Sequence, residues 1–340
     1  MPDPLASRGW SVSAVILAVL AGGAYLSLTS GMFDLTFAEM VKTLLRIDPV
    51  KEHDLVVFDF RLPRIVLSAL VGAALGMAGT VIQGVTRNGL AEPGILGINA
   101  GAGLAVVLFM FFFQGSMQIK GWMAVMIMPM FGLVGGFMAV LLIYLFSQQN
   151  GRLDPQRLIL VGIAIASGFG AATLYVSLKM NPNDFEMAAV WLAGSIYNAN
   201  WKFVLTMLPW LIILPPILWW KSRSLDLIQL GEDSAISLGV KVERDKHILL
   251  LCSIGLVAAS VAVSGSIGFV GLIAPHMARR LVGLNHTSIL PVSGLIGAAM
   301  VVWGDYVGKT IFAPAELAAG IVISIIGVPY FVFLLLKMKR

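Results

Sequence analysis

The chain has 340 residues, of which 58% are hydrophobic and 12% are charged, and its formal net charge is +5. Soluble domains carry about 25% charged residues, so this composition excludes an ordinary soluble fold and indicates a polytopic membrane protein. The single cysteine, Cys252, excludes an intrachain disulfide framework and a metal site built from cysteines. Because Lys and Arg lie between apolar runs, the positive charge reflects membrane topology and not nucleic-acid binding.

Ten apolar runs approach the length of about 20 residues that crosses the hydrocarbon layer. In chain order, we expect spans at about 11–30, 61–85, 94–114, 121–146, 157–179, 201–220, 243–263, 267–283, 289–308 and 317–337. The sequence thus predicts an all-α fold in which residues 1–340 form a single transmembrane domain. Most basic residues fall on the side of the two termini, which favours an N-in, C-in topology.

Two segments outside these spans are expected to be ordered on the outer side. Residues 35–47 have apolar positions at helical spacing, which predicts an amphipathic surface helix. Residues 183–200 are too short to span and too apolar for a free loop, so we expect a short helix that dips into the outer leaflet. Within the second span, Gly72 and Gly76 have the spacing typical of close helix contacts.

Arg61 and Arg64 begin the second span at its outward end and lie on one helical face. Arginines at a span end can anchor the helix at the membrane interface. The guanidinium group also binds carboxylates through two hydrogen bonds, so a site for carboxylates of an external partner is the alternative. Both interpretations stay open on the residues alone.

Helix breaks are predicted where Gly and Pro are dense, at residues 87–94 and 268–276. The second stretch leads into Arg279 and Arg280, which are expected to face the cytoplasm.

The most unusual segment is 221–246, a polar stretch of 26 residues with ten charged side chains between two apolar runs. Gly231 is followed by Glu232 and Asp233, which suits the start of a helix because the helix dipole favours acids there. Gly239 is expected to end this short helix. We predict a docking element for another protein that displays four apolar side chains: Ile228, Leu230, Ile236 and Leu238. A surface helix that folds back onto its own membrane domain is the alternative.

Several chemistries are disfavoured by the sequence. Residues 304–310 resemble a nucleotide-binding loop, but three residues separate Gly304 from Gly308 where the motif needs four. The four histidines are scattered, so no metal site is expected. The sequence also lacks a nucleophile and a neighbouring base of the kind that would indicate an enzyme. Few ionisable residues lie deep in the spans, which disfavours a stand-alone secondary transporter. Backbone carbonyls at broken helices could still hold a coupling ion, so this function remains an alternative.

Five segments occur in the order and spacing of one family: Arg61–Arg64, GAALGMAGTVIQGVTRNGLAEPGILGINAGAG, LGEDSAISLGV, GSIGFVGLIAPHMARRLVG and Asp305–Glu316. From about residue 55 to the C-terminus, the chain resembles the FecCD-type permeases. These are the membrane subunits of type II ABC importers for iron–siderophore, haem and cobalamin uptake. The stretch around residues 87–103 is most similar to ferric-hydroxamate siderophore permeases, whereas cobalamin and haem permeases share the same motifs.

The resemblance implies roles for three groups of residues. Arg61 and Arg64 match outer arginines that meet glutamates of a substrate-binding protein, and Lys309 stands where the family usually has a third arginine. Seven residues match the family's coupling helices, which sit in a groove of the ATPase: Ile228, Leu230, Gly231, Glu232, Ala235, Leu238 and Gly239. An inner gate is matched by Asp154, Pro155 and Gln156.

The resemblance also implies the partners and the location. It predicts a multi-pass protein of the bacterial plasma membrane that transports without being an enzyme. A second permease chain, two cytoplasmic ATPase subunits and an extracytoplasmic binding protein are expected to complete the importer. Departures such as Lys309 favour a heterodimer of unlike permease chains. The chain is expected to bind no cofactor, with ATP and Mg²⁺ on the partner ATPase.

Overall fold

A computed structural model describes residues 4–31, 35–47, 50–113, 122–149, 152–153 and 155–338. In these ranges the fold is helical apart from one antiparallel pair of two-residue strands, β1 and β2. The elements are α1 (Pro4–Thr29), α2 (Phe37–Leu44), α3 (Lys51–Asp54), η1 (Leu55–Arg61), α4 (Leu62–Thr86), η2 (Pro93–Leu96), α5 (Ile98–Phe113), α6 (Trp122–Ser147), β1 (Gln148–Gln149), β2 (Arg152–Leu153), α7 (Pro155–Ser177), α8 (Pro182–Leu192), α9 (Trp201–Trp220), α10 (Ser222–Gln229), α11 (Glu232–Ser237), α12 (Val242–Ser264), α13 (Val270–Val282), α14 (His286–Ile311) and α15 (Ala319–Met338).

Within the described ranges, eight helices are long and apolar enough to cross a membrane, so the chain is a polytopic membrane protein. They are α1, the continuous helix formed by α3, η1 and α4, and α6, α7, α9, α12, α14 and α15. The two other expected spans are shorter than predicted. Residues 94–114 contain α5 with 16 residues, and residues 267–283 contain α13 with 13 residues. At 1.5 Å per residue, α13 reaches only about 20 Å of the roughly 30 Å hydrocarbon thickness.

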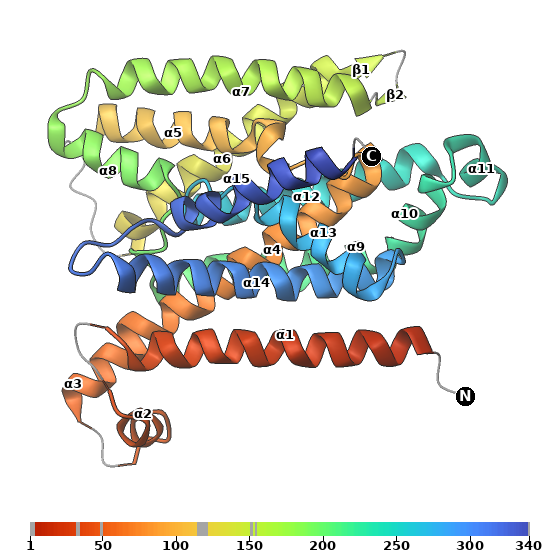
Figure 1. The fold of residues 1–340 in the computed structure, drawn as a ribbon. Helices are drawn as coiled ribbons and strands as arrows, with labels where there is room; N and C mark the ends of the chain where they lie inside the picture. Colours follow the sequence, from red (N-terminus) through yellow and green to blue (C-terminus); the bar gives the residue numbers. More distant parts are fainter. Residues whose placement is uncertain are drawn as a thin grey trace.

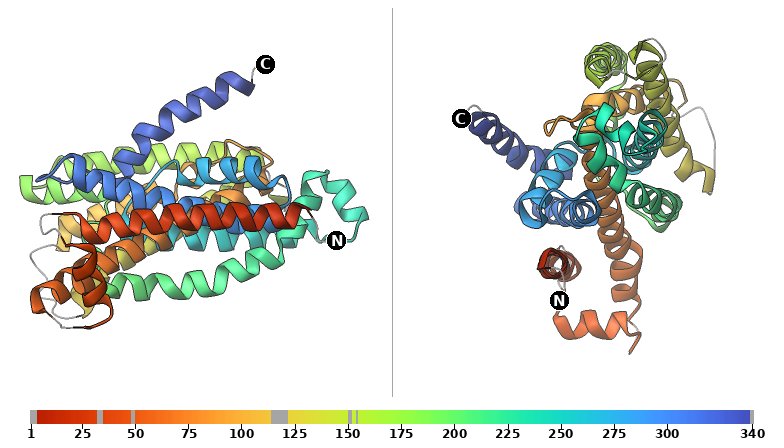
Figure 2. Two further views of the ribbon diagram at one scale, coloured as in Figure 1. Left: turned by 60° about the horizontal axis from the view of Figure 1, so that its bottom comes forward. Right: turned by 90° about the vertical axis from the view of Figure 1, so that its right-hand side faces the viewer.

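The long helices run side by side, and five short helices, α2, α3, α8, α10 and α11, lie at the two ends of the bundle (Figure 1). One end, termed here the α11 end, carries α10 and α11 together with the start of α1 and the end of α15 (Figures 1 and 2). The opposite end, termed the α2 end, carries α2, α3 and α8. The helices predicted at residues 35–47 and 183–200 are therefore present, as α2 and α8, at the end away from the polar segment.

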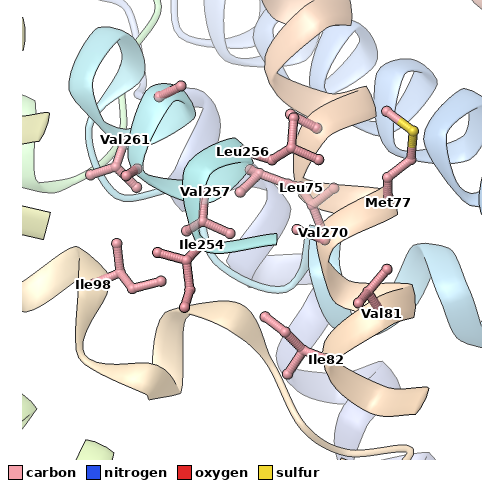
Figure 3. Packing of buried hydrophobic residues seen from close by; sticks show 14 of the residues in the cluster. Leu75, Met77, Val81, Ile82, Ile98, Ile254, Leu256, Val257, Val261 and Val270 are labelled. Carbon is pink, nitrogen blue, oxygen red and sulfur yellow. The ribbon is translucent and has the colours of Figure 1, made fainter. Parts of the chain in front are cut away.

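The core forms around α4, most of which is buried. Figure 3 shows Leu75 and Ile82 of α4 lying among Val257 of α12 and Val270 of α13. All four side chains are almost completely buried. Because α4 is surrounded by other helices, it fixes the relative positions of the elements at both ends.

Small residues allow α4 to approach α14 closely. A methyl group added to Gly72 would overlap the backbone oxygen of Gly297, and one added to Gly297 would overlap the oxygen of Gly72. One turn along, Gly76 has the same relation to the backbone oxygen of Ser293. Gly72 and Gly76 thus lie at a tight helix contact, as their spacing predicted.

The two predicted helix breaks meet inside the bundle. The Glu92 carboxylate, before η2, accepts a hydrogen bond from the backbone N–H of Phe269 at the start of α13. Phe269 itself has a φ of +65°. From α4, the Gln83 amide donates to the carbonyl of Gly271 at 3.2 Å. A carboxylate at the first turn of α13 is favourable for the helix dipole, so the α4–α5 junction holds the short helix in place.

Replacing Gly72 by Ala is expected to destabilise the bundle, because the added methyl group would force α4 and α14 apart. Overpacking of this kind costs about 1–3 kcal/mol. Gly22→Ala is the matched control, since a methyl group added at this position of α1 would meet no atom within 4 Å. Thermal unfolding of the purified protein in detergent should show a lower Tm for Gly72→Ala than for Gly22→Ala. Equal Tm values for the two variants would contradict this contact.

Candidate functional site

Five charged side chains at the α2 end form what we call the arginine cluster: Arg61, Arg64, Asp305, Lys309 and Glu316. At its centre Arg64 of α4 binds two carboxylates. Its Nε and Nη2 donate to the two oxygens of Asp305 at 2.8 and 2.9 Å, and Nη2 also donates to Glu316 at 2.7 Å. Arg64 therefore joins α4 to α14 and to the turn before α15.

The other two basic residues of the cluster contact the end of α1. Arg61 is buried and its Nη1 donates to the carbonyl of Leu28. Lys309 of α14 donates from Nζ to the carbonyl of Ser27 at 3.2 Å. All five charged residues line a cavity of about 480 Å³, bordered also by Gly31 and Pro314. The structure thus brings the three predicted docking residues together, although all three have partners within the chain.

At the opposite end, the polar segment forms two short helices, α10 and α11, where one was expected. Gly231, with a φ of +119°, separates them, and Gly239, with a φ of +85°, follows α11. These conformations suit glycine because it has no Cβ.

Three apolar side chains of this segment face outward and form what we call the α11 surface. Leu230, Ile236 and Leu238 are 66%, 59% and 61% exposed. The prediction that Ile228 is displayed was wrong, because Ile228 is fully buried and packs in a small cluster with Ala235 and Val242. Ala235, also among the predicted coupling residues, is likewise buried. α10 therefore turns Leu225 and Ile228 toward its own chain, whereas α11 buries Ala235 and exposes Ile236.

Two ion pairs attach the polar segment to the start of α12. Lys246, which is fully buried, donates from Nζ to Glu232 of α11 at 2.6 Å and lies 3.8 Å from Glu243. The neighbouring Asp245 accepts from Lys221 and from Ser224, both at 2.6 Å. A buried ammonium group needs such partners, because an unpaired charge away from water is costly.

A third polar contact attaches α10 to the start of α14. One carboxylate oxygen of Asp226 lies 2.6 Å from Nδ1 of the buried His286 and accepts from the His286 backbone N–H at 3.0 Å. The Gln229 amide lies 3.4 Å from the other ring nitrogen. His286 also lies against α4, since an added Cβ at Gly84 would be 3.2 Å from Nε2. The polar segment is thus bound to α12, α14 and, through His286, α4.

The predicted inner gate is described only in part. Asp154 lies outside the described residues, Pro155 begins α7, and Gln156 is exposed in its first turn. Residues 304–310 lie within the continuous helix α14, so they do not form a nucleotide-binding loop. Among the residues that the structure describes, no three His, Cys, Asp or Glu side chains are grouped to hold a metal ion.

Sequence reasoning missed the acidic partners in both regions. The predicted topology already placed Asp305 and Glu316 on the side of Arg64. The order of the spans could therefore have predicted that these acids pair with Arg64. Asp226, Glu232 and Asp245 were counted only as charges of the polar segment. Their pairing with His286, Lys246 and Lys221, respectively, depends on how α10 and α11 fold back, which no local pattern indicates.

Comparison with known proteins identifies relatives over nearly the whole chain. Residues 16–337 match the FecCD transport family. The chain is 52% identical over 327 residues to the iron-uptake system permease protein FeuC of Bacillus subtilis, covering 96% of this chain and 97% of the relative. It is 49% identical over 284 residues to the iron(3+)-hydroxamate import system permease protein FhuG of the same organism, covering 84% of each.

A solved structure gives the same assignment. A metal-chelate type ABC transporter in an inward-facing conformation superposes with a TM-score of 0.82 and 31% identity, over 96% of this chain and 99% of the other. The resemblance found in the sequence motifs is therefore confirmed, and the chain belongs to the FecCD transport family.

Proposed function

We propose that the chain is the permease subunit of an ABC importer that carries an iron(III)–siderophore complex of the hydroxamate type into the cytoplasm. The observation that carries this proposal is near full-length identity of 52% and 49% to two permeases named for iron uptake and iron(3+)-hydroxamate import. Cobalamin or haem would use the same machinery and is the alternative cargo. In this proposal, a partner ATPase supplies the energy and a substrate-binding protein delivers the cargo.

The α11 end is proposed to face the cytoplasm, in the plasma membrane of a bacterium. This orientation agrees with the excess of Lys and Arg at that end. The α11 surface offers exposed apolar side chains beside acidic residues on a segment outside the long helices. Exposed apolar groups with a polar surround are typical of a protein contact, and the partner proposed here is the ATPase dimer.

A movement of the ATPase would be transmitted to the membrane helices through the three polar contacts that join α10 and α11 to α12 and α14. Glu232 connects α11 to Lys246 of α12, and Asp226 connects α10 to His286 of α14. Both pairs contain a buried base, so their geometry is costly to break. A displacement of α10 and α11 should therefore move α12 and α14. This movement would switch the permease between its outward-facing and inward-facing states, so that ATP drives alternating access.

A second permease chain is proposed to complete the pathway. Few side chains of α7 and a minority of those of α15 are buried in the single chain, in contrast with the largely buried α4 and α12. Such faces require lipid or another subunit in a membrane. Since α7 carries small residues such as Gly168 and Gly170 on an exposed face, a close approach of a second subunit is favoured there.

Breaking α11 should uncouple hydrolysis from transport. Proline costs about 3 kcal/mol within a helix, so Ser237→Pro should leave the importer assembled in the membrane but lower the iron imported per ATP hydrolysed. Ser237→Ala is the control, because it removes only the hydroxyl that donates to the Asp233 carbonyl. The measurement is uptake of radioactive ferric hydroxamate and phosphate release in the same vesicles. Normal uptake by Ser237→Pro would show that α11 is only a surface feature.

The anchor of α11 can be tested separately. Glu232→Ala would leave the buried Lys246 ammonium with Glu243 at 3.8 Å as its acid, and we expect α11 to be destabilised by about 1–2 kcal/mol. Amide hydrogen exchange over residues 231–241 should accelerate roughly tenfold. Asp233→Ala removes the adjacent, exposed acid from the same helix turn and should have a smaller effect. Equal acceleration in both variants would rule out the Lys246 contact as the anchor.

A further inference from the structure

The two carboxylates bound to Arg64 are held unequally. Asp305 makes two hydrogen bonds to the guanidinium, and its side chain is 7% exposed. Glu316 makes one hydrogen bond to Nη2, and its side chain is 29% exposed. Asp305 also belongs to the long helix α14, whereas Glu316 lies in the turn between α14 and α15. Glu316 is therefore the carboxylate that can be exchanged.

We propose that Glu316 occupies the position on Arg64 that a carboxylate of the docking substrate-binding protein takes, so that docking exchanges one carboxylate for another. This inference rests on the proposed function. The cavity of about 480 Å³ beside Arg64 gives an incoming side chain room to enter. Among the described residues, Arg61 and Lys309 line it beside Arg64. Guanidinium groups bind carboxylates through charge-assisted hydrogen bonds, so an incoming carboxylate finds suitable donors there.

Departure of Glu316 would change the start of α15. Next to it, Leu317 donates from its backbone N–H to the carbonyl of Gly308 at 3.1 Å. Gly320 donates similarly to the carbonyl of Gly194 at 2.9 Å. The turn is thus held by a few hydrogen bonds and by the Arg64–Glu316 pair. Once this pair opens, the turn retains less to hold it against α14.

The helix that follows this turn is suited to move. Most side chains of α15 that lie beyond Ile323 are at least partly exposed, and Figure 2 shows the end of α15 projecting away from the other helices. Few buried contacts mean a lower cost of displacement. Glu316 is therefore a positioning residue, which holds the start of α15 until an external carboxylate replaces it on Arg64. In this way docking of the binding protein changes the position of a membrane helix.

The test uses the complete importer in lipid nanodiscs and the system's own binding protein loaded with a ferric trihydroxamate. Glu316→Gln removes the competing negative charge. The Kd for the binding protein should fall about three- to tenfold, and ATP hydrolysis without binding protein should rise, so that the stimulation on docking becomes smaller. Glu186→Gln on α8 is the matched control, because it removes another exposed acid from the same end. Glu316→Asp keeps the charge and should restore much of the wild-type stimulation.

The exchange is overturned if Glu316→Gln and Glu186→Gln have the same Kd and the same stimulation. It is overturned also if Glu316→Gln lowers the Kd but leaves stimulation unchanged, because the turn then carries no signal. A separate variant distinguishes these failures from failure of the proposed docking. Arg64→Gln should weaken binding at least about tenfold. If the wild-type importer does not bind the protein, or Arg64→Gln binds as tightly as wild type, docking at Arg64 is itself wrong.

Discussion

The backbone of α4 lies directly against the backbone of α14 because Gly72 and Gly297 face each other without side chains. In hydrocarbon, helix association depends on close packing more than on the hydrophobic effect, so this contact determines how the two helices are aligned. At one end the alignment brings Arg64 to Asp305, and at the other it brings His286 against Gly84. The α4–α14 pair is therefore a rigid connection between the two polar regions of the molecule.

Charged groups of this chain gather where they can be paired or reach water. Arg64 binds two carboxylates at the α2 end, while Lys246 and Asp245 find partners in the polar segment at the α11 end. The two regions differ in how the charged groups are shared. At the α11 end, the almost fully buried Lys246 ammonium contacts Glu232 of α11, whereas at the α2 end Arg64 binds the well-buried Asp305 and, as a second carboxylate, the more exposed Glu316. A buried base that holds a short helix at one end and an exchangeable second carboxylate at the other suit the proposed importer, in which an ATPase and a binding protein act on opposite sides.

Hydropathy and helix signals were sufficient to predict most long helices, the surface helices α2 and α8, and the glycine breaks around α11. The prediction failed where tertiary packing overrides the local pattern. Residues 267–283 looked like a span, but α12 ends at Ser264 and the chain turns inside the core, leaving α13 too short. Ile228 is apolar in a polar segment, which indicates an exposed contact as readily as an inward-facing anchor. Which of the two it is depends on how α10 folds back onto α12 and α14, and sequence spacing carries no information on that.

As proposed above, this chain moves its cargo only when a separate ATPase drives it. This can be measured by uptake of a radioactive ferric hydroxamate into proteoliposomes that contain the chain alone, or the chain with its permease partner, ATPase and binding protein. Accumulation is expected only in the complete system, with ATP in the compartment that the ATPase faces. Accumulation by the chain alone, driven by a proton or sodium gradient, would contradict it and identify a secondary transporter.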